Sequence, residues 1–325
     1  MSRNWKRLAA DYGPMLAIWV VLVLLFGALS DNFLTTRTLA NIAGQVPALA
    51  VIACGMTFVL IIAGIDLSVG SVLALSGSVL CVSMGVLPLP VAILLAILTG
   101  GLAGLFNGAV SVFLKIPSFI VSLGTLKIAF GLAMLVTSSE TVTVGLKLEP
   151  FVDRFLGVPV SFWVALGVVL GGQFILTRTV FGRYLIAIGT NDEAVRLAGV
   201  PTASKKIAVF VFCGLLTGLA SVLFAARLGG MNADAGNGLE LAAIAAVVIG
   251  GTSLMGGRGS VVNSFVGVLI ILTLDAGLAQ IGAREFLKHL ITGVVIIVAV
   301  TLDALRGDLL ASLQRRFQPK TSSSQ

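Results

Sequence analysis

Long runs of apolar, almost uncharged residues fill this chain, and short segments that carry its charges separate them. Each run is long enough to cross the hydrocarbon core of a bilayer, which takes about 20 residues of helix. Lipid offers no hydrogen-bond partners, so the runs should be helices. The pattern predicts an all-α fold, a polytopic transmembrane helix bundle of about ten spans, at residues 13–30, 46–63, 68–86, 90–114, 118–137, 160–177, 204–226, 240–257, 261–281 and 287–305.

Composition and charge agree with a membrane protein. Hydrophobic residues make up 58% of the chain and charged residues 11%, against about 25% charged residues in an ordinary soluble domain. Lysine and arginine concentrate in alternate segments, which the positive-inside rule places in the cytoplasm together with both termini. The net charge of +7 then reflects topology and anionic membrane lipid, and not nucleic-acid binding. The opposite, outer segments hold only Arg37, Lys147, Arg154, Arg227, Arg284 and Lys288.

The N-terminus has a second interpretation. Arg3, Lys6 and Arg7 precede an apolar run that ends in Ala28-Leu29-Ser30, a pattern that resembles a cleavable signal peptide. Removing this run would spoil the charge asymmetry, so a retained first span is favoured. We therefore expect a single transmembrane domain over residues 1–325, with cytoplasmic tails at 1–12 and 306–325 and a cytoplasmic loop at 178–203.

Small residues are placed regularly within the predicted spans. Glycine recurs every fourth residue at Gly100, Gly104 and Gly108, and again in the pairs Gly167 with Gly171 and Gly214 with Gly218. This spacing predicts close helix packing in lipid, and lining of a substrate path is the alternative. The cysteines Cys54, Cys81 and Cys213 lie inside spans without metal or redox spacing, so they should be small core residues.

Charged residues in or beside the spans are few, and each is a functional candidate because charge is costly in a membrane. Asp66 and Glu240 stand at the starts of two predicted spans, as helix caps, gating groups or contacts between subunits. Lys127 and Asp275 lie within spans and could pair across helices, whereas His289 is expected to be an interfacial polar residue. These groups do not form the relay across the bilayer that an ion pump needs.

Two segments resemble each other and suggest an inverted repeat of two halves. Gly64-Ile65-Asp66-Leu67, followed by Gly77, aligns without gaps with Gly238-Leu239-Glu240-Leu241, followed at the same spacing by Gly251. An odd number of predicted spans separates the two, so they are expected on opposite faces of the membrane, as inverted duplication produces. Chance similarity between apolar helices is the alternative.

The loop 178–203 contains a predicted short helix outside the membrane. Thr190-Asn191-Asp192-Glu193 fits a capping box with Thr190 as the N-cap and the glutamate three residues later. Gly199 and Pro201 are typical of a helix end. Such a helix indicates a docking site for another protein, and a solvated connector is the alternative.

Three stretches of this sequence together resemble the permeases of bacterial ABC importers for monosaccharides such as ribose, xylose and arabinose. The resemblance extends from about residue 30 to 305, and the third stretch is the most specific. It departs from the family at Ala63 and Asn263, where glycine is common, and at Ala242, where an acid is frequent. The stretches are Ile65-Asp66-Leu67-Ser68-Val69-Gly70-Ser71, Gly189-Thr190-Asn191 through Ala198-Gly199-Val200, and Glu240-Leu241 through Gly250-Gly251-Thr252-Ser253-Leu254 with Gly256-Gly257-Arg258-Gly259-Ser260.

The resemblance implies a multi-pass protein of the bacterial inner membrane that pairs with a second permease copy or a homologue. It also implies ABC ATPase subunits beneath this core and a periplasmic sugar-binding protein above it, near 138–159 and 227–239. The segment matching 189–200 would be the ATPase-coupling helix, with the candidates Thr190, Asn191, Asp192, Glu193, Ala194, Arg196 and Gly199. Candidates for the translocation path or its gate are Asp66, Ser68, Glu240, Gly250, Gly251 and Thr252.

The sequence contains no Gly-x-x-x-x-Gly-Lys-Ser/Thr phosphate loop, so ATP should bind a partner and this chain should bind no cofactor. We expect a transport subunit and not an enzyme, moved between outward and inward openings by a push on residues 190–199. An ion-coupled or passive carrier is the main alternative and should place charges along its path. A membrane enzyme should show clustered histidines, acids or cysteines, and the chain has a single histidine.

Overall fold

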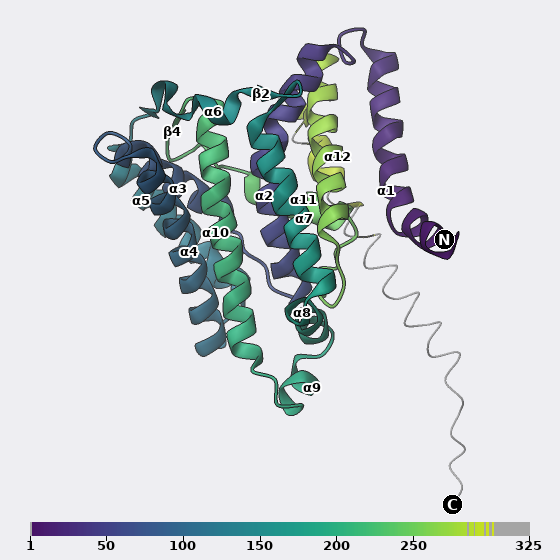
Figure 1. Cartoon of the computed structure of the whole chain (residues 1–325), viewed down its shortest axis with the longest axis vertical. Helices are drawn as coiled ribbons and strands as arrows, with labels where there is room; N and C mark the ends of the chain where they lie inside the picture. The colour runs from purple at the N-terminus through teal and green to yellow at the C-terminus, as the bar shows by residue number, and fades with distance from the viewer. Residues whose placement is uncertain (1, 285, 289, 296, 299–300, 302–325) are drawn as a thin grey trace, which may run out of the picture.

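The computed structural model describes residues 2–284, 286–288, 290–295, 297–298 and 301, and they form a bundle of helices (Figure 1). Two short strand pairs and a 3-10 turn at Gly145–Leu148 cover one end of the bundle. β1 (Val142–Thr143) pairs with β4 (Gly230–Met231), and β2 (Arg154–Phe155) with β3 (Val158–Pro159), both antiparallel. The helices are α1 (Ser2–Leu29), α2 (Thr36–Ile61), α3 (Val69–Ser83), α4 (Leu89–Phe113), α5 (Ser118–Thr137), α6 (Glu149–Val152), α7 (Val160–Arg178), α8 (Val180–Thr190), α9 (Asp192–Leu197), α10 (Thr202–Leu228), α11 (Leu239–Ile249) and α12 (Val261–Gln280).

The all-α prediction is confirmed. Within the described residues, six helices are long and apolar enough to cross a membrane, namely α2, α4, α5, α7, α10 and α12. Shorter apolar helices are Met15–Leu29 of α1, α3, α8, α11 and a run at Phe286–Val295, so the number of spans stays a prediction. The end of the predicted span 287–305, the tail 306–325 and His289 lie outside the described residues, while most of the predicted tail 1–12 is helical from Ser2 onward.

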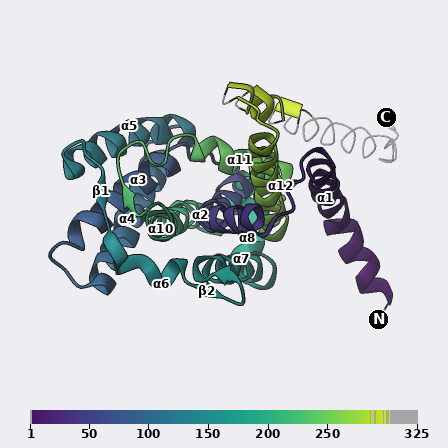
Figure 2. The ribbon, with the colours of Figure 1, turned by 90° about the horizontal axis from the view of Figure 1, so that it is seen from above.

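The two long helices α2 and α10 lie side by side in the middle of the bundle (Figure 2). Within its most apolar stretch α2 is 89% buried, whereas α4, α5 and α7 are each 28% buried. A helix that is apolar on all sides is buried on all sides, and partly exposed apolar helices fit a surface that meets lipid. α10 packs on α3 and α4, and α2 packs reciprocally on α11 and α12, while α1 lies at the edge and packs on α12.

Glycines allow the closest of these contacts. A Cβ atom on Gly100 would collide with the carbonyl oxygen of Gly214, and one on Gly104 with that of Phe210. The predicted glycine packing is therefore confirmed between α4 and α10. A Cβ atom added to Gly167 or Gly171 of α7 would meet nothing within 4 Å, so this pair packs on no other part of the described chain.

Two predicted span boundaries are wrong, for local reasons, and one predicted loop contains a further helix. The span predicted at 46–63 begins at Thr36, because a polar first stretch is still helical and is capped by Thr35, whose Oγ1 accepts from the Thr38 amide at 3.4 Å. The span predicted at 240–257 ends at Ile249, where Gly251, at φ 83°, closes the helix. The loop predicted at 178–203 contains the eleven-residue helix α8.

Candidate functional site

The helix α9 lies at one extreme end of the bundle, between α8 and α10 (Figure 1). Its N-cap is Asn191 and not Thr190, which corrects the predicted capping box. Asn191 has an extended backbone, at φ −160° and ψ 93°, and its Oδ1 accepts from the Ala194 amide at 3.0 Å. Thr190 is still helical as the last residue of α8, and its hydroxyl donates to the Ile186 carbonyl at 2.8 Å.

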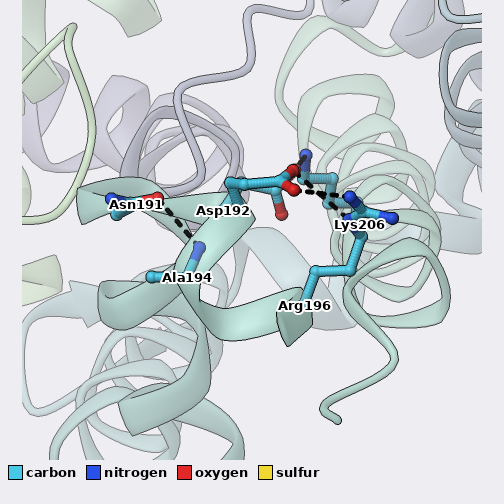
Figure 3. A network of polar contacts seen from close by, with 6 residues as sticks. Asn191, Asp192, Ala194, Arg196 and Lys206 are labelled. Atoms are coloured by element: carbon cyan, nitrogen blue, oxygen red, sulfur yellow. Dashed lines mark hydrogen bonds and ion pairs between the residues drawn. The ribbon is translucent and has the colours of Figure 1, made fainter. Parts of the chain in front are cut away.

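Two ion pairs hold the short helix (Figure 3). Glu193 does not reach back to the N-cap but pairs with Arg196 at 2.5 Å on the exposed face, and this hydrogen bond raises the pKa of the Arg196 guanidinium. Asp192 accepts from Lys206 of α10 at 2.7 Å, which ties α9 to the next long helix. Gly199, at φ 83°, ends the helix as predicted.

Helix α8 joins α9 to the bundle, and sequence reasoning missed it. Its buried residues Gly182, Leu185 and Ile188 recur every third position, and Thr179 caps it by accepting from the Gly182 amide at 3.2 Å. The remaining face is polar or only partly buried. This amphipathic helix has only eleven residues, too few to be read as a span, and the threefold spacing of its buried residues is the signal that could have revealed it.

The backbone at the end of α8 is in direct contact with the backbone of two other segments. We call this contact the glycine junction, and its residues are Ile61, Ala63, Gly189, Gly256 and Gly257. A Cβ atom on Gly189 would collide with the Ile61 carbonyl oxygen and crowd the Gly257 amide. That amide donates to the same carbonyl at 2.9 Å. Ala63 adopts φ 57°, a conformation that favours glycine. The end of α8 therefore touches both the end of α2 and the loop after α11.

Asp66 is buried at the break between α2 and α3. Its Oδ1 accepts from the Ser68 amide at 2.9 Å and the Ser68 hydroxyl at 2.6 Å, and the Asn107 side-chain amide donates to both carboxylate oxygens at 3.3 Å. Thr125 of α5 donates to Asn107 at 2.5 Å. We call Asp66, Ser68, Asn107 and Thr125 the Asp66 cluster. The carboxylate therefore fixes the turn that leads into α3, whose own N-cap, Ser68, forms no side-chain cap hydrogen bond.

Asn107 and Thr125 were missed by sequence reasoning, although each is a buried polar residue inside an apolar span. Buried polar side chains need partners, so their presence in α4 and α5 was a usable signal. Serines at the start of α5 brace the same break through backbone amides. Leu67 donates to the Ser122 hydroxyl at 3.0 Å and Ile65 to the Ser118 hydroxyl at 2.9 Å.

Glu240 lies beside the start of α3, so the expectation that the two acids occupy opposite membrane faces is wrong. A Cβ atom on Gly70 would collide with the Glu240 carboxylate and the Gly236 carbonyl oxygen. The reason is helix length. α3 has 15 residues and α11 has 11, about 22 and 16 Å at 1.5 Å per residue, so neither spans the roughly 30 Å hydrocarbon core.

Gly250, Gly251 and Thr252 form the turn that follows α11. A Cβ atom on Gly250 would lie 2.6 Å from the Asn263 carbonyl oxygen, so glycine allows α11 to turn onto α12. Thr252 is buried with its hydroxyl 3.5 Å from that of Ser264. The Ser264 hydroxyl in turn accepts from Thr57 of α2 at 2.8 Å. These residues link the turn to the centre of the bundle.

The two other charged residues predicted within spans do not meet. Lys127 of α5 and Asp275 of α12 form no ion pair with each other, and both are exposed at the surface of the bundle. The three cysteines are buried and free, as predicted for core residues.

These features define a polytopic membrane protein with a short, capped helix at one end of its bundle and two short helices, α3 and α11, in its core. Residues 38–300 match the family model described as branched-chain amino acid transport system / permease component, and the chain belongs to this family. No solved structure matches the chain.

Several relatives are named as sugar permeases. The chain is 38% identical over 291 residues to the ribose import permease protein RbsC of Escherichia coli strain K12, covering 87% of this chain and 91% of that one. It is 36% identical over 298 residues to the L-arabinose ABC transporter permease protein AraH of Azospirillum brasilense, covering 89% and 87%. It is 32% identical over 365 residues to the xylose transport system permease protein XylH of Escherichia coli strain K12, covering 92% and 93%.

Proposed function

We propose that this chain is the transmembrane permease subunit of an ABC importer in a bacterial inner membrane. It translocates a monosaccharide or similar small polyol that a periplasmic binding protein delivers, and a separate subunit hydrolyses the ATP. Family membership and the names of the ribose, arabinose and xylose relatives support the class of transporter and of solute. The observation that carries the mechanism is the glycine junction. It connects α9, through α8, to the end of α2 and to the loop after α11.

This connection would couple ATP hydrolysis on the partner subunit to solute transport by this chain. A force on α9 passes through the Asp192–Lys206 pair to α10 and through α8 to the glycine junction. There it reaches the α2–α3 break and the turn between α11 and α12. Rigid elements that meet end to end transmit a displacement with little loss, and a bundle with two packed states converts it into alternating access. The ATPase partner would therefore dock on α9.

A second permease copy, or a homologue, fits the outer face of α5. Lys127 lies near the middle of this predicted span and is exposed, where direct contact with lipid would be costly. Gly124 and Gly131 share its face, and nothing lies within 4 Å of a Cβ atom at either position. Small residues around one charge favour a protein partner or a water-filled path at this face over lipid.

The proposed topology keeps about ten crossings, with both termini and α9 in the cytoplasm. Two of these crossings combine a short helix, α3 or α11, with the non-helical segment beside it. Reciprocal packing of α10 on α3 and α4, and of α2 on α11 and α12, supports an inverted repeat of two halves. In such folds the ends of discontinuous helices meet at the substrate path. The adjacent starts of α3 and α11 make Asp66, Ser68 and Glu240 the residues that set the geometry there, with Gly250, Gly251 and Thr252 completing the second half.

The carrier alternative is less well supported. An ion-coupled carrier needs an ionisable group that exchanges its partner during transport. The Asp66 carboxylate is instead engaged by Ser68 and Asn107 of the same half. The absence of a phosphate loop from the sequence supports ATP binding on the partner alone, with no cofactor on this chain.

Reconstitution tests the proposal. The chain is placed in proteoliposomes with its ATPase and binding protein, and uptake of labelled ribose, arabinose and xylose is measured. We expect uptake only when all components and ATP are present. Uptake by the chain alone would refute the proposal in favour of a carrier.

A further inference from the structure

A polar pocket of about 930 Å³ lies at the end of the bundle opposite α9. Of its lining, only Arg154 belongs to a segment, 138–159, that is expected to meet the periplasmic binding protein. It is bounded by the turn between α1 and α2, the end of α12, and β2 (Figure 1). Seen from above, α1 borders the bundle at its edge, away from the central pair α2 and α10 (Figure 2). The lining residues that matter are Asn32, Thr35, Arg37, Thr38, Arg154 and Gln280.

Hydrogen bonds within the chain build the floor of this pocket. The Gln280 side-chain amide donates to the Thr38 hydroxyl at 3.0 Å, which joins the end of α12 to the start of α2. The hydroxyls of Thr38 and Thr35 both donate to the Asn32 carbonyl, at 2.9 and 2.8 Å. The turn before α2, the start of α2 and the end of α12 are thereby fixed to one another, so this side of the pocket is formed before any ligand arrives.

The pocket is positively charged. Arg37 and Arg154 come from segments far apart in the sequence and line the same cavity, and its lining includes no acid. In the part of the chain that the structure describes, neither arginine forms an ion pair. The N-terminus of α2 adds the positive end of a 26-residue helix. Two guanidinium groups beside a helix start suit a phosphate, which arginine binds with paired hydrogen bonds.

Exposed apolar side chains surround the pocket. Leu29, Leu34 and Ile281 are 59%, 53% and 46% exposed. Trp163, whose indole donates to the Phe155 carbonyl at 3.1 Å, lies next to the β2–β3 hairpin. Tryptophan and arginine next to exposed leucines are typical of the boundary between headgroups and hydrocarbon. The pocket therefore has the polarity of a headgroup site and neighbours that suit acyl chains.

We propose that this pocket binds the phosphate headgroup of an anionic phospholipid of the phosphatidylglycerol class. Arg37 and Arg154 contact the phosphate, Asn32 and Gln280 face the headgroup hydroxyls, and the acyl chains lie along the exposed apolar side chains of α1. Bound lipid lies against the end of α1 and ties the turn before α2 to the hairpin. This inference does not depend on the transported solute or on the ATPase partner.

Native mass spectrometry of the purified full chain tests the proposal. The protein is titrated with phosphatidylglycerol, with zwitterionic phosphatidylcholine and with inorganic phosphate, and the double variant R37Q/R154Q is compared with R178Q. Arg178 is an exposed arginine in the last turn of α7, at the other end of the bundle, and its replacement removes one charge of the same kind. We expect phosphatidylglycerol to bind in preference to phosphatidylcholine. Its affinity should fall roughly fivefold for each pocket arginine removed and stay unchanged in R178Q.

Three results would overturn the proposal. Equal losses in R178Q and in the pocket variant, scaled per charge, would show unspecific attraction. Displacement of the lipid by inorganic phosphate at equal concentration would show a site for a free anion. Unchanged lipid binding in R37Q/R154Q, together with weaker binding of the periplasmic protein, would make the pocket a protein docking site. A melting temperature of R37Q/R154Q close to that of R178Q confirms that the variant is folded.

Discussion

Gly189→Ala is the sharpest test of the glycine junction, because it adds one methyl group where backbone meets backbone. The new Cβ atom would overlap the Ile61 carbonyl oxygen and press on the Gly257 amide, neither of which is a flexible side-chain end. The end of α8 must move away from α2, or the Gly257–Ile61 hydrogen bond of 2.9 Å must break. Helix α9 would then lose its fixed position relative to the end of α2 and the loop after α11.

The expected change in stability follows from two costs and one gain. Forcing an extra methyl group into a packed site costs about 1–3 kcal/mol, and a lost hydrogen bond about 1 kcal/mol. Replacing glycine by alanine inside a helix returns about 1 kcal/mol. We expect a net destabilisation of about 1–3 kcal/mol, enough to disturb the junction while the protein still inserts.

Gly167→Ala in α7 is the matched control, because it is also a helical glycine but has no atom within 4 Å of the new side chain. It should be neutral or stabilising by up to about 1 kcal/mol. The assay measures melting temperature in detergent, and both ATP hydrolysis and solute uptake in proteoliposomes with the partner subunits. For Gly189→Ala we expect a lower melting temperature and less uptake per ATP hydrolysed. Behaviour identical to Gly167→Ala in both measurements would refute the role of the junction.

Three further predictions concern α9 and the buried cluster. Asn191→Ala should destabilise α9 by about 1 kcal/mol through loss of its N-cap, while Thr190→Val should have little effect; hydrogen exchange of the α9 amides distinguishes them, and equal protection would contradict the assigned cap. The Asp192–Lys206 pair, half-exposed, is worth about 0.2–1 kcal/mol, so Asp192→Lys should lower uptake per ATP and Lys206→Asp in the same chain should restore it; failure of that rescue would remove the pair from the coupling route. Asn107→Leu leaves a buried carboxylate short of a donor and should cost about 1–3 kcal/mol, seen as a lower melting temperature; an unchanged value would show that the cluster does not hold the α2–α3 break.

Most of the helices could be predicted from hydropathy because their apolar runs and their hydrogen-bonded helices coincide. The span predicted at 118–137 matches α5, and that at 90–114 nearly matches α4. The misses have one physical origin. Hydropathy detects contact with lipid or core, so it overlooked the polar first turns of α2 and the amphipathic α8. It also extended α11 through a glycine turn that is apolar but cannot remain helical.

The candidate site was predictable only where the signal is local. The end of α9 at Gly199 depends on one backbone conformation and could be predicted. The N-cap was off by one position, because Thr190 and Asn191 are both good caps and the continuation of α8 decides between them. The glycine junction and the contact of Gly70 with Glu240 join segments distant in sequence. Nothing local in either segment records that proximity.

The distribution of burial limits where the bundle can move. Residues 46–61 of α2 are almost all buried, and a close-packed interior resists small displacements of its members. The short helices α3 and α11 differ, because α3 begins at a buried polar contact, α11 begins at an exposed one, and α11 is followed by a glycine with positive φ. Hinges form at the ends of such elements. Since α8 touches the ends of α2 and the turn after α11, and not their packed middles, a push on α9 acts where the backbone can yield. Coupling should therefore be more sensitive to substitutions at the junction than to equally large ones in the core of α2.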